Sequence, residues 1–151
     1  MIIRSIISAT AVLFASAPAF AGGLPGNYVA TGAAIGLQGQ GAGASILGRA
    51  ELTPGLSARA QVTQNQSTEG SVGLTGDIAV DQNLNIYLGG GAGFSGGTGS
   101  DTVLNRGQST VGYAQLGIEG AIGDAVLFLD NKVAFGNQTT YVPTVGVGIK
   151  F

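Results

Sequence analysis

The chain has 151 residues and a mass of 14.9 kDa, a size that suits one compact domain. Only 9% of the residues are charged and the formal net charge is −2, so the sequence lacks the basic surface of a nucleic-acid-binding protein. The absence of cysteine excludes disulfides and thiolate metal sites, and the absence of histidine removes the commonest general base of enzymes.

The first 21 residues have the pattern of a cleaved export signal. Arg4 precedes an apolar run that ends at Ala17, and Ala19-Phe20-Ala21 supplies the small residues typical of a cleavage site. The apolar run is shorter than the roughly 20 residues that a transmembrane helix needs. We therefore expect residues 1–21 to be removed, with Ala19 and Ala21 marking the cleavage site, and residues 22–151 to form the mature domain.

Residues after the signal form a regular succession of segments with the pattern of β-strands. Apolar residues alternate with small or polar ones, and glycine, proline, asparagine or aspartate bounds each segment. Helix is disfavoured because glycine recurs inside most segments, at about 1 kcal/mol each relative to alanine. Eight strands are predicted, at residues 28–37, 45–52, 56–64, 71–80, 84–94, 111–122, 125–136 and 140–151.

The connections between these segments fall into two kinds. Three have the composition of tight turns, at residues 53–55, 81–83 and 123–124. Four are predicted to be longer, at residues 38–44, 65–70, 95–110 and 137–139. Because the two kinds alternate, we expect turns at one end of the assembly and loops at the other. The loop at residues 95–110 is expected to be the most exposed surface for any partner.

The two faces of each predicted strand differ in polarity. One face carries the large apolar side chains, for example Ile46, Val72 and Leu88, and Asn131 is the clearest exception, which suggests a bulge in the seventh strand. The other face carries the charged side chains of the strands: Arg49, Glu51, Arg59, Asp77, Glu119, Asp130, Lys132 and Lys150. The remaining charged residues after the signal, among them Glu69, fall in predicted turns or loops.

Alternation by itself fits a soluble barrel that binds an apolar ligand inside, as well as a membrane barrel with its apolar face outward. A soluble surface normally carries more charge than one or two residues per strand. The export signal and the alternation of short and long connections are typical of outer-membrane barrels. A sheet in lipid has to close, because exposed edges would leave backbone groups unpaired. The sequence therefore predicts an all-β fold, a closed antiparallel up-and-down transmembrane β-barrel of about eight strands.

The inward charges are balanced, which predicts a lumen filled by mutually neutralising side chains. Four are basic and four acidic, and an unpaired buried charge is unfavourable. The interior of an eight-stranded barrel is just wide enough for side chains to fill it. Glycines at inward positions, such as Gly73 and Gly117, leave open the alternative of a narrow, porin-like channel for small solutes.

The last strand carries a recognisable motif. In residues 141–151, apolar residues at every second position lead to a terminal phenylalanine, and the motif residues are Tyr141, Val145, Val147, Ile149 and Phe151. This ending resembles the C-terminal signature of bacterial outer-membrane β-barrel proteins, which the barrel-assembly machinery reads. The whole chain resembles the small eight-stranded barrels of the outer-membrane protein A and X type. The resemblance implies an outer-membrane location and an assembly role for the final strand.

Motifs that would indicate chemistry are weak. Ser95 lies in a Gly-x-Ser-x-Gly sequence, but no histidine is present to activate it. Residues 96–104 match one nonapeptide calcium repeat, although such sites are built from stacked copies. No catalytic residue, cofactor or metal site is predicted, and the expected role of the protein is structural or based on surface interactions.

Overall fold

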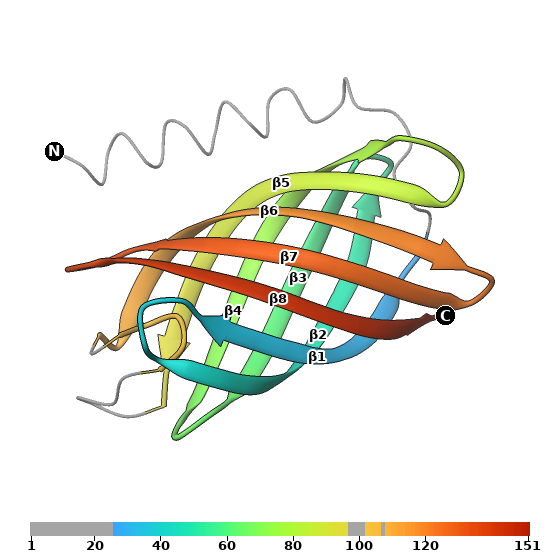
Figure 1. Ribbon diagram of the computed structural model, residues 1–151. Coiled ribbons are helices and arrows are strands. Elements are labelled where there is room, and N and C mark those ends of the chain that lie inside the picture. Colours follow the sequence, from blue (N-terminus) through green and yellow to red (C-terminus); the bar gives the residue numbers. More distant parts are fainter. Residues whose placement is uncertain (1–25, 97–101, 107) are drawn as a thin grey trace, which may run out of the picture.

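Eight antiparallel strands close into a barrel in the computed structural model, which describes residues 26–96, 102–106 and 108–151 (Figure 1). The strands follow sequence order and β1 closes the barrel against β8. The predicted fold class is confirmed. The predicted signal at residues 1–21, with Ala19 and Ala21, lies outside the described residues. The strands are β1 (Tyr28–Gly36), β2 (Gly41–Thr53), β3 (Leu56–Gln64), β4 (Thr68–Ala79), β5 (Leu84–Ser95), β6 (Thr110–Ile122), β7 (Ala125–Phe135) and β8 (Thr139–Lys150).

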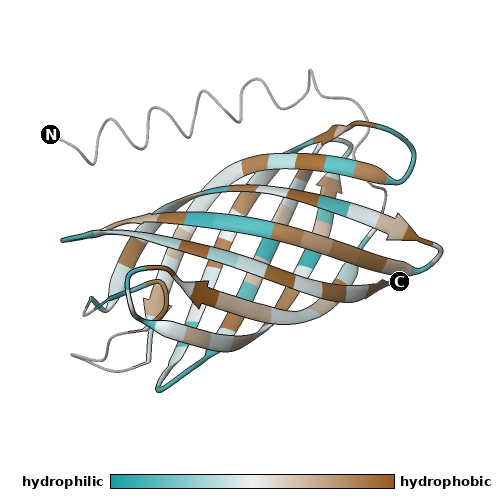
Figure 2. Cartoon of the chain, in the orientation of Figure 1, coloured by the Kyte–Doolittle hydropathy of each residue, from teal (hydrophilic) through white to brown (hydrophobic). Residues whose placement is uncertain are grey.

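The apolar face of the sheet points outward and the charged face points into the barrel. Large apolar side chains such as Leu88 and Val147 are 40% and 51% exposed, whereas every charged residue of the described strands is buried or half-buried. Hydrophobic and hydrophilic positions alternate along the strands (Figure 2). This arrangement is the opposite of a soluble barrel with an apolar interior, and it provides the outer surface that a bilayer requires.

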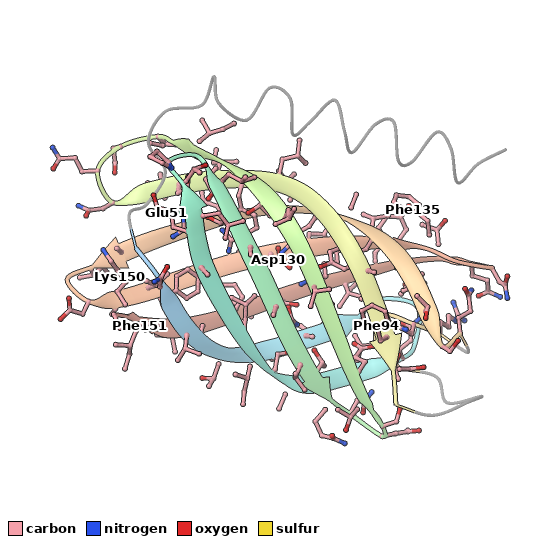
Figure 3. The ribbon with its side chains drawn as sticks, turned by 180° about the vertical axis from the view of Figure 1, so that it is seen from behind. Glu51, Phe94, Asp130, Phe135, Lys150 and Phe151 are labelled. Atoms are coloured by element: carbon pink, nitrogen blue, oxygen red, sulfur yellow. The ribbon has the colours of Figure 1, made fainter. Side chains whose placement is uncertain are left out.

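The two ends of the barrel differ in their connections. At the turn end, which we define by the links at residues 54–55, 80–83 and 123–124, the backbone N–H of Lys150 donates to the carbonyl of Asp124 at 2.8 Å. Figure 3 places Glu51, Lys150 and Phe151 at this end, Phe94 and Phe135 at the opposite loop end, and Asp130 between them. In the described part of the chain, no helix is long and apolar enough to cross a membrane.

The connections at the loop end are shorter than the sequence predicted. The strand β2 begins at Gly41 rather than residue 45, and β4 begins at Thr68 rather than residue 71. Gly36 pairs with Gly41 across a tight link in which Gly39 and Gly41 have φ angles of +91° and +78°, a conformation that favours glycine. Backbone pairing thus continues through small and polar residues that carry no apolar alternation, and only the link between β5 and β6 is long.

The bulge predicted at Asn131 is wrong. Asn131 pairs with Leu116 on β6 and with Pro143 on β8 without a shift in register. The one register shift among the described strand pairs lies between Glu51 and Thr53, where β2 approaches its turn. A polar side chain on the apolar face therefore does not require a break in the ladder, because backbone pairing is independent of what that side chain contacts.

Candidate functional site

A neutral cluster of four charged side chains crosses the lumen. Arg49 on β2 and Arg59 on β3 face Asp77 on β4 and Glu119 on β6, and all four side chains are at most 2% exposed. The Nη2 atom of Arg49 lies 3.0 Å from Oδ2 of Asp77, and Nη1 of Arg59 lies 3.0 Å from Oε2 of Glu119. Two longer contacts, Arg49–Glu119 and Arg59–Asp77, are both 3.4 Å and close the cluster.

Neutral polar side chains complete the hydrogen bonding of the two carboxylates. Glu119 accepts from the Tyr28 hydroxyl at 2.7 Å and from the Asn85 amide at 2.8 Å. Asp77 accepts from the hydroxyl groups of Ser57 and Thr75. Buried charges persist only when they are paired and hydrogen-bonded, and here each carboxylate has both arginines and two neutral donors.

A second charged group is built around Asp130 and Lys132 on β7. The Lys132 Nζ atom lies 2.7 Å from Oδ2 of Asp130 and 2.6 Å from Oε1 of Gln61. The Gln115 amide and the Tyr87 hydroxyl donate to Oδ1 of Asp130 at 2.8 and 2.9 Å. The Tyr87 ring also lies 3.5 Å from the Arg59 guanidinium carbon, in a cation–π contact. Tyr87 therefore links the two charged groups across the lumen.

Tyrosine side chains occupy space beside several of the inward glycines that made a channel an alternative. A Cβ atom added to Gly117 would lie 2.2 Å from the Tyr87 ring, and one added to Gly73 or Gly91 would lie 2.6–2.7 Å from the Tyr113 hydroxyl. At Gly117 the Tyr87 ring from the neighbouring strand occupies the space of a side chain, whereas at Gly73 and Gly91 the Tyr113 hydroxyl occupies it together with backbone atoms of the adjoining strand. The lumen is consequently packed at these heights.

Replacing Gly117 by alanine is expected to lower the free energy of unfolding by about 1–3 kcal/mol, because the new methyl group overlaps a ring that Asp130 and Arg59 hold in place. Gly112 on the same strand is the matched control, since a Cβ there meets nothing within 4 Å. Urea unfolding of both variants in lipid vesicles measures the difference. Equal stability of the two variants would show that Tyr87 is free to move aside.

The long link between β5 and β6 enters the mouth of the barrel. Residues 102–105 are buried, with Val103 and Leu104 packed in an apolar cluster that includes Val111, Tyr113 and Val142. The backbone N–H of Leu104 donates to both oxygens of Glu69, at 2.9 and 3.2 Å. The expectation that residues 95–110 form the most exposed surface is therefore wrong for residues 102–105, because apolar side chains and the hydrogen bond to Glu69 hold them inside. Residues 97–101 and with them most of the calcium-repeat match lie outside the described residues.

The remaining predicted lumen charges lie apart from these groups. Glu51 is half-buried at the turn end and accepts from the Gly26 N–H at 2.7 Å. Lys150 is half-exposed and takes no part in the ion pairs of the described residues. Sequence reasoning missed Tyr28, Tyr113 and Glu69. Tyr28 and Tyr113 occupy inward positions in the alternation, so the sequence could have placed them in the lumen. Glu69 could not be placed in this way, because its position depends on where β4 begins.

The motif residues of the final strand line the outer face. Tyr141, Val145, Val147 and Ile149 are exposed on β8, and Phe151 is 82% exposed beyond its end. The backbone N–H of Phe151 donates to the carbonyl of Asn27 at 3.0 Å, next to the β1–β8 closure. The side chains proposed as an assembly signal therefore share one face of the closing strand.

Solved structures resemble the barrel, although no protein-family profile and no curated sequence matches the chain. The N-terminal β-barrel domain of OprF from Pseudomonas aeruginosa aligns with a TM-score of 0.61 at 14% identity, covering 85% of this chain and 99% of that domain. Its fold is that of a small outer-membrane β-barrel. The outer membrane protein Ail of Yersinia pestis, in a phospholipid bilayer nanodisc, aligns at 0.57 and 13% identity over 83% of this chain and 98% of Ail. The crystal structure of Ail aligns with a TM-score of 0.55 at 15% identity, covering 85% of this chain and 100% of that chain. The predicted resemblance to small eight-stranded barrels is confirmed for the fold.

Proposed function

We propose that this protein is a non-enzymatic outer-membrane β-barrel with a closed lumen and a structural or surface-interaction role. The observation that carries the proposal is the packed lumen, in which the cluster of Arg49, Arg59, Asp77 and Glu119 is joined through Tyr87 to Asp130 and Lys132. Residues 102–105 occupy the mouth above it. The lack of histidine and cysteine supports a role without catalysis, since the usual activated nucleophiles are missing.

The packed lumen favours a surface role over a transport role. Ail, which shares the fold, is the attachment invasion locus protein of Yersinia pestis. The apolar outer face of this chain suits it to a bilayer, where the loop end would be presented on one side. Migration of the folded and boiled protein at different positions on a gel tests the membrane-barrel form.

The closed lumen predicts that the purified protein adds no conductance steps above baseline in planar bilayers. Arg49, Arg59, Asp77 and Glu119 contact one another across the lumen and Tyr87 packs on Arg59, so we expect no continuous ion path at the charged cluster. The combined variant Tyr87→Ala and Arg59→Ala serves as the positive control, because it removes the ring and the guanidinium that span the lumen. Regular steps from the unmodified protein would favour the narrow, porin-like channel instead.

Removal of Phe151 is expected to reduce the amount of folded protein in the outer membrane severalfold, if the assembly machinery reads the final strand. Removal of the exposed loop residue Gln138 is the control of equal length. Surface-exposed folded protein in whole cells, measured by gel migration of membrane fractions, reports both. Similar yields from the two deletions would contradict the assembly role of Phe151.

A further inference from the structure

A polar pocket lies at the loop end, where three links that are distant in the sequence meet. Its volume is about 210 Å³, and it is lined by Gln38, Gly39 and Gln40 from the β1–β2 link, Gln66 from the β3–β4 link and Arg106 from the β5–β6 link. No carboxylate is among these lining residues. The Asn65 side chain donates to the Gln40 carbonyl at 2.8 Å, which holds the first two links together.

The glutamines of the β1–β2 link offer donors to the pocket. The Gln38 side-chain oxygen accepts from the Tyr141 N–H at 3.2 Å, and the Gln40 side-chain oxygen accepts from the Gln38 N–H at 3.1 Å. With both carbonyl oxygens engaged on the backbone, the NH₂ groups are the remaining functional ends. The Gln40 Nε2 atom is buried and has no hydrogen-bond partner in the described part of the chain, and an unsatisfied buried donor at a pocket is a feature that a bound anion explains.

Arg106 supplies a positive charge that the described residues leave unpaired. Unlike Arg49 and Arg59, it takes part in none of their ion pairs. Its φ angle is +22°, and it is the one non-glycine residue of the described chain with a positive φ. The preceding Asn105 is buried and donates to the Ser109 carbonyl at 3.3 Å, so Arg106 stands on an anchored segment. Strained backbone held by its surroundings is typical of functional positions.

We propose that this pocket binds a phosphate group, carried either by a soluble phosphate ester or by a lipid headgroup. A guanidinium with two amide NH₂ groups, and no acid among the lining residues that the structure describes, selects for an anion. The guanidinium comes from the β5–β6 link and the two amide groups from the β1–β2 link, and the planar guanidinium is the side chain best suited to bidentate pairing with phosphate oxygens. The binding site goes beyond the closed-barrel role, and it does not depend on whether the lumen conducts.

Binding is tested by NMR on the folded, isotope-labelled protein. In one arm, inorganic phosphate is titrated into protein held in a phosphate-free detergent. In the other arm, the protein is placed in phosphatidylglycerol nanodiscs without added phosphate. We expect the side-chain NH₂ signals of Gln38 and Gln40 to shift in at least one arm. Arg106→Gln should weaken saturable binding at least fivefold, and Arg106→Lys should weaken it less because the charge is kept.

The control variant is Lys150→Gln, which removes the same charge at the turn end and should leave binding unchanged. Shifts with inorganic phosphate identify a soluble ligand, and shifts only in the nanodisc identify a lipid headgroup. Both outcomes support the pocket when Arg106→Gln weakens the response as expected. The proposal would be overturned if neither arm shifted the Gln38 and Gln40 signals. It would also be overturned if Arg106→Gln protein that migrates as folded on a gel showed the same shifts as the unmodified protein. Conductance steps in planar bilayers would overturn the closed lumen without affecting this result.

Discussion

Replacing Arg59 by methionine is expected to lower the free energy of unfolding by about 3–5 kcal/mol, the range for breaking a buried ion pair from one side. Methionine keeps much of the side-chain volume but removes the charge between Asp77 and Glu119. Both carboxylates then share Arg49 alone, which leaves one uncompensated negative charge in the lumen. The variant also loses the contact between the guanidinium and the Tyr87 ring.

Urea unfolding in phospholipid vesicles, followed by gel migration of unboiled samples, measures this loss. Lys150→Met is the matched control, because Lys150 makes no ion pair among the described residues, and it should change the free energy of unfolding by less than about 0.5 kcal/mol. The double variant Arg59→Met with Glu119→Gln restores neutrality and should recover part of the loss. If Arg59→Met and Lys150→Met behaved alike, the cluster would have no structural role.

The sequence was sufficient to predict which face of each strand is apolar. Side chains alternate with a period of two along a strand, so one well-placed residue such as Leu88 determines the direction of its neighbours. That the apolar face points outward was inferred from the low charge of the whole chain and from the export signal. Closure followed because a sheet with its apolar face in lipid cannot leave an edge unpaired. Strand number therefore follows from the order of the amino acids, and sidedness follows from that order together with the low charge of the chain and the export signal.

The sequence could not predict in the same way which side chains the inward charges contact. Alternation gives the face of a residue but not its height in the barrel, which depends on strand tilt and on the register of every pair. Arg59 meets Glu119 from β6 across the lumen, 60 residues away in the sequence, while its ladder partner on β2 is Arg49. Equal numbers of acids and bases predicted neutralisation but not the division into two groups joined by Tyr87.

The loop end was predicted least well, because its strands continue through residues without a strand pattern. Glu69 was assigned to a loop, yet it pairs with Ser95 in the ladder and its carboxylate receives the Leu104 N–H. That contact joins two segments whose proximity exists only after the barrel has closed. The same holds for the pocket at Arg106, where Gln40 and Gln66 arrive from separate links.

Replacing Leu88 by arginine is expected to destabilise the barrel by about 2–4 kcal/mol, the range for a basic residue on the lipid face near the middle of a bilayer. Leu88 points outward from β5 between Gly76 and Leu116, and it is 40% exposed. Lipid cannot hydrate the guanidinium there, and no acidic side chain is exposed on the neighbouring strands. Urea unfolding in vesicles compared with Leu88→Ala separates the charge from the loss of the leucine side chain.

An arginine placed at another depth in the bilayer is the sharper control for Leu88→Arg. Leu52 is also exposed on the outer face, but it lies at the turn end of β2, where headgroups and water are near. Leu52→Arg should therefore destabilise the barrel by only about 0–1 kcal/mol. A soluble barrel would tolerate arginine equally at both positions, because both side chains would already be in water. A large difference between Leu88→Arg and Leu52→Arg thus identifies the solvent that surrounds the middle of the barrel as hydrocarbon.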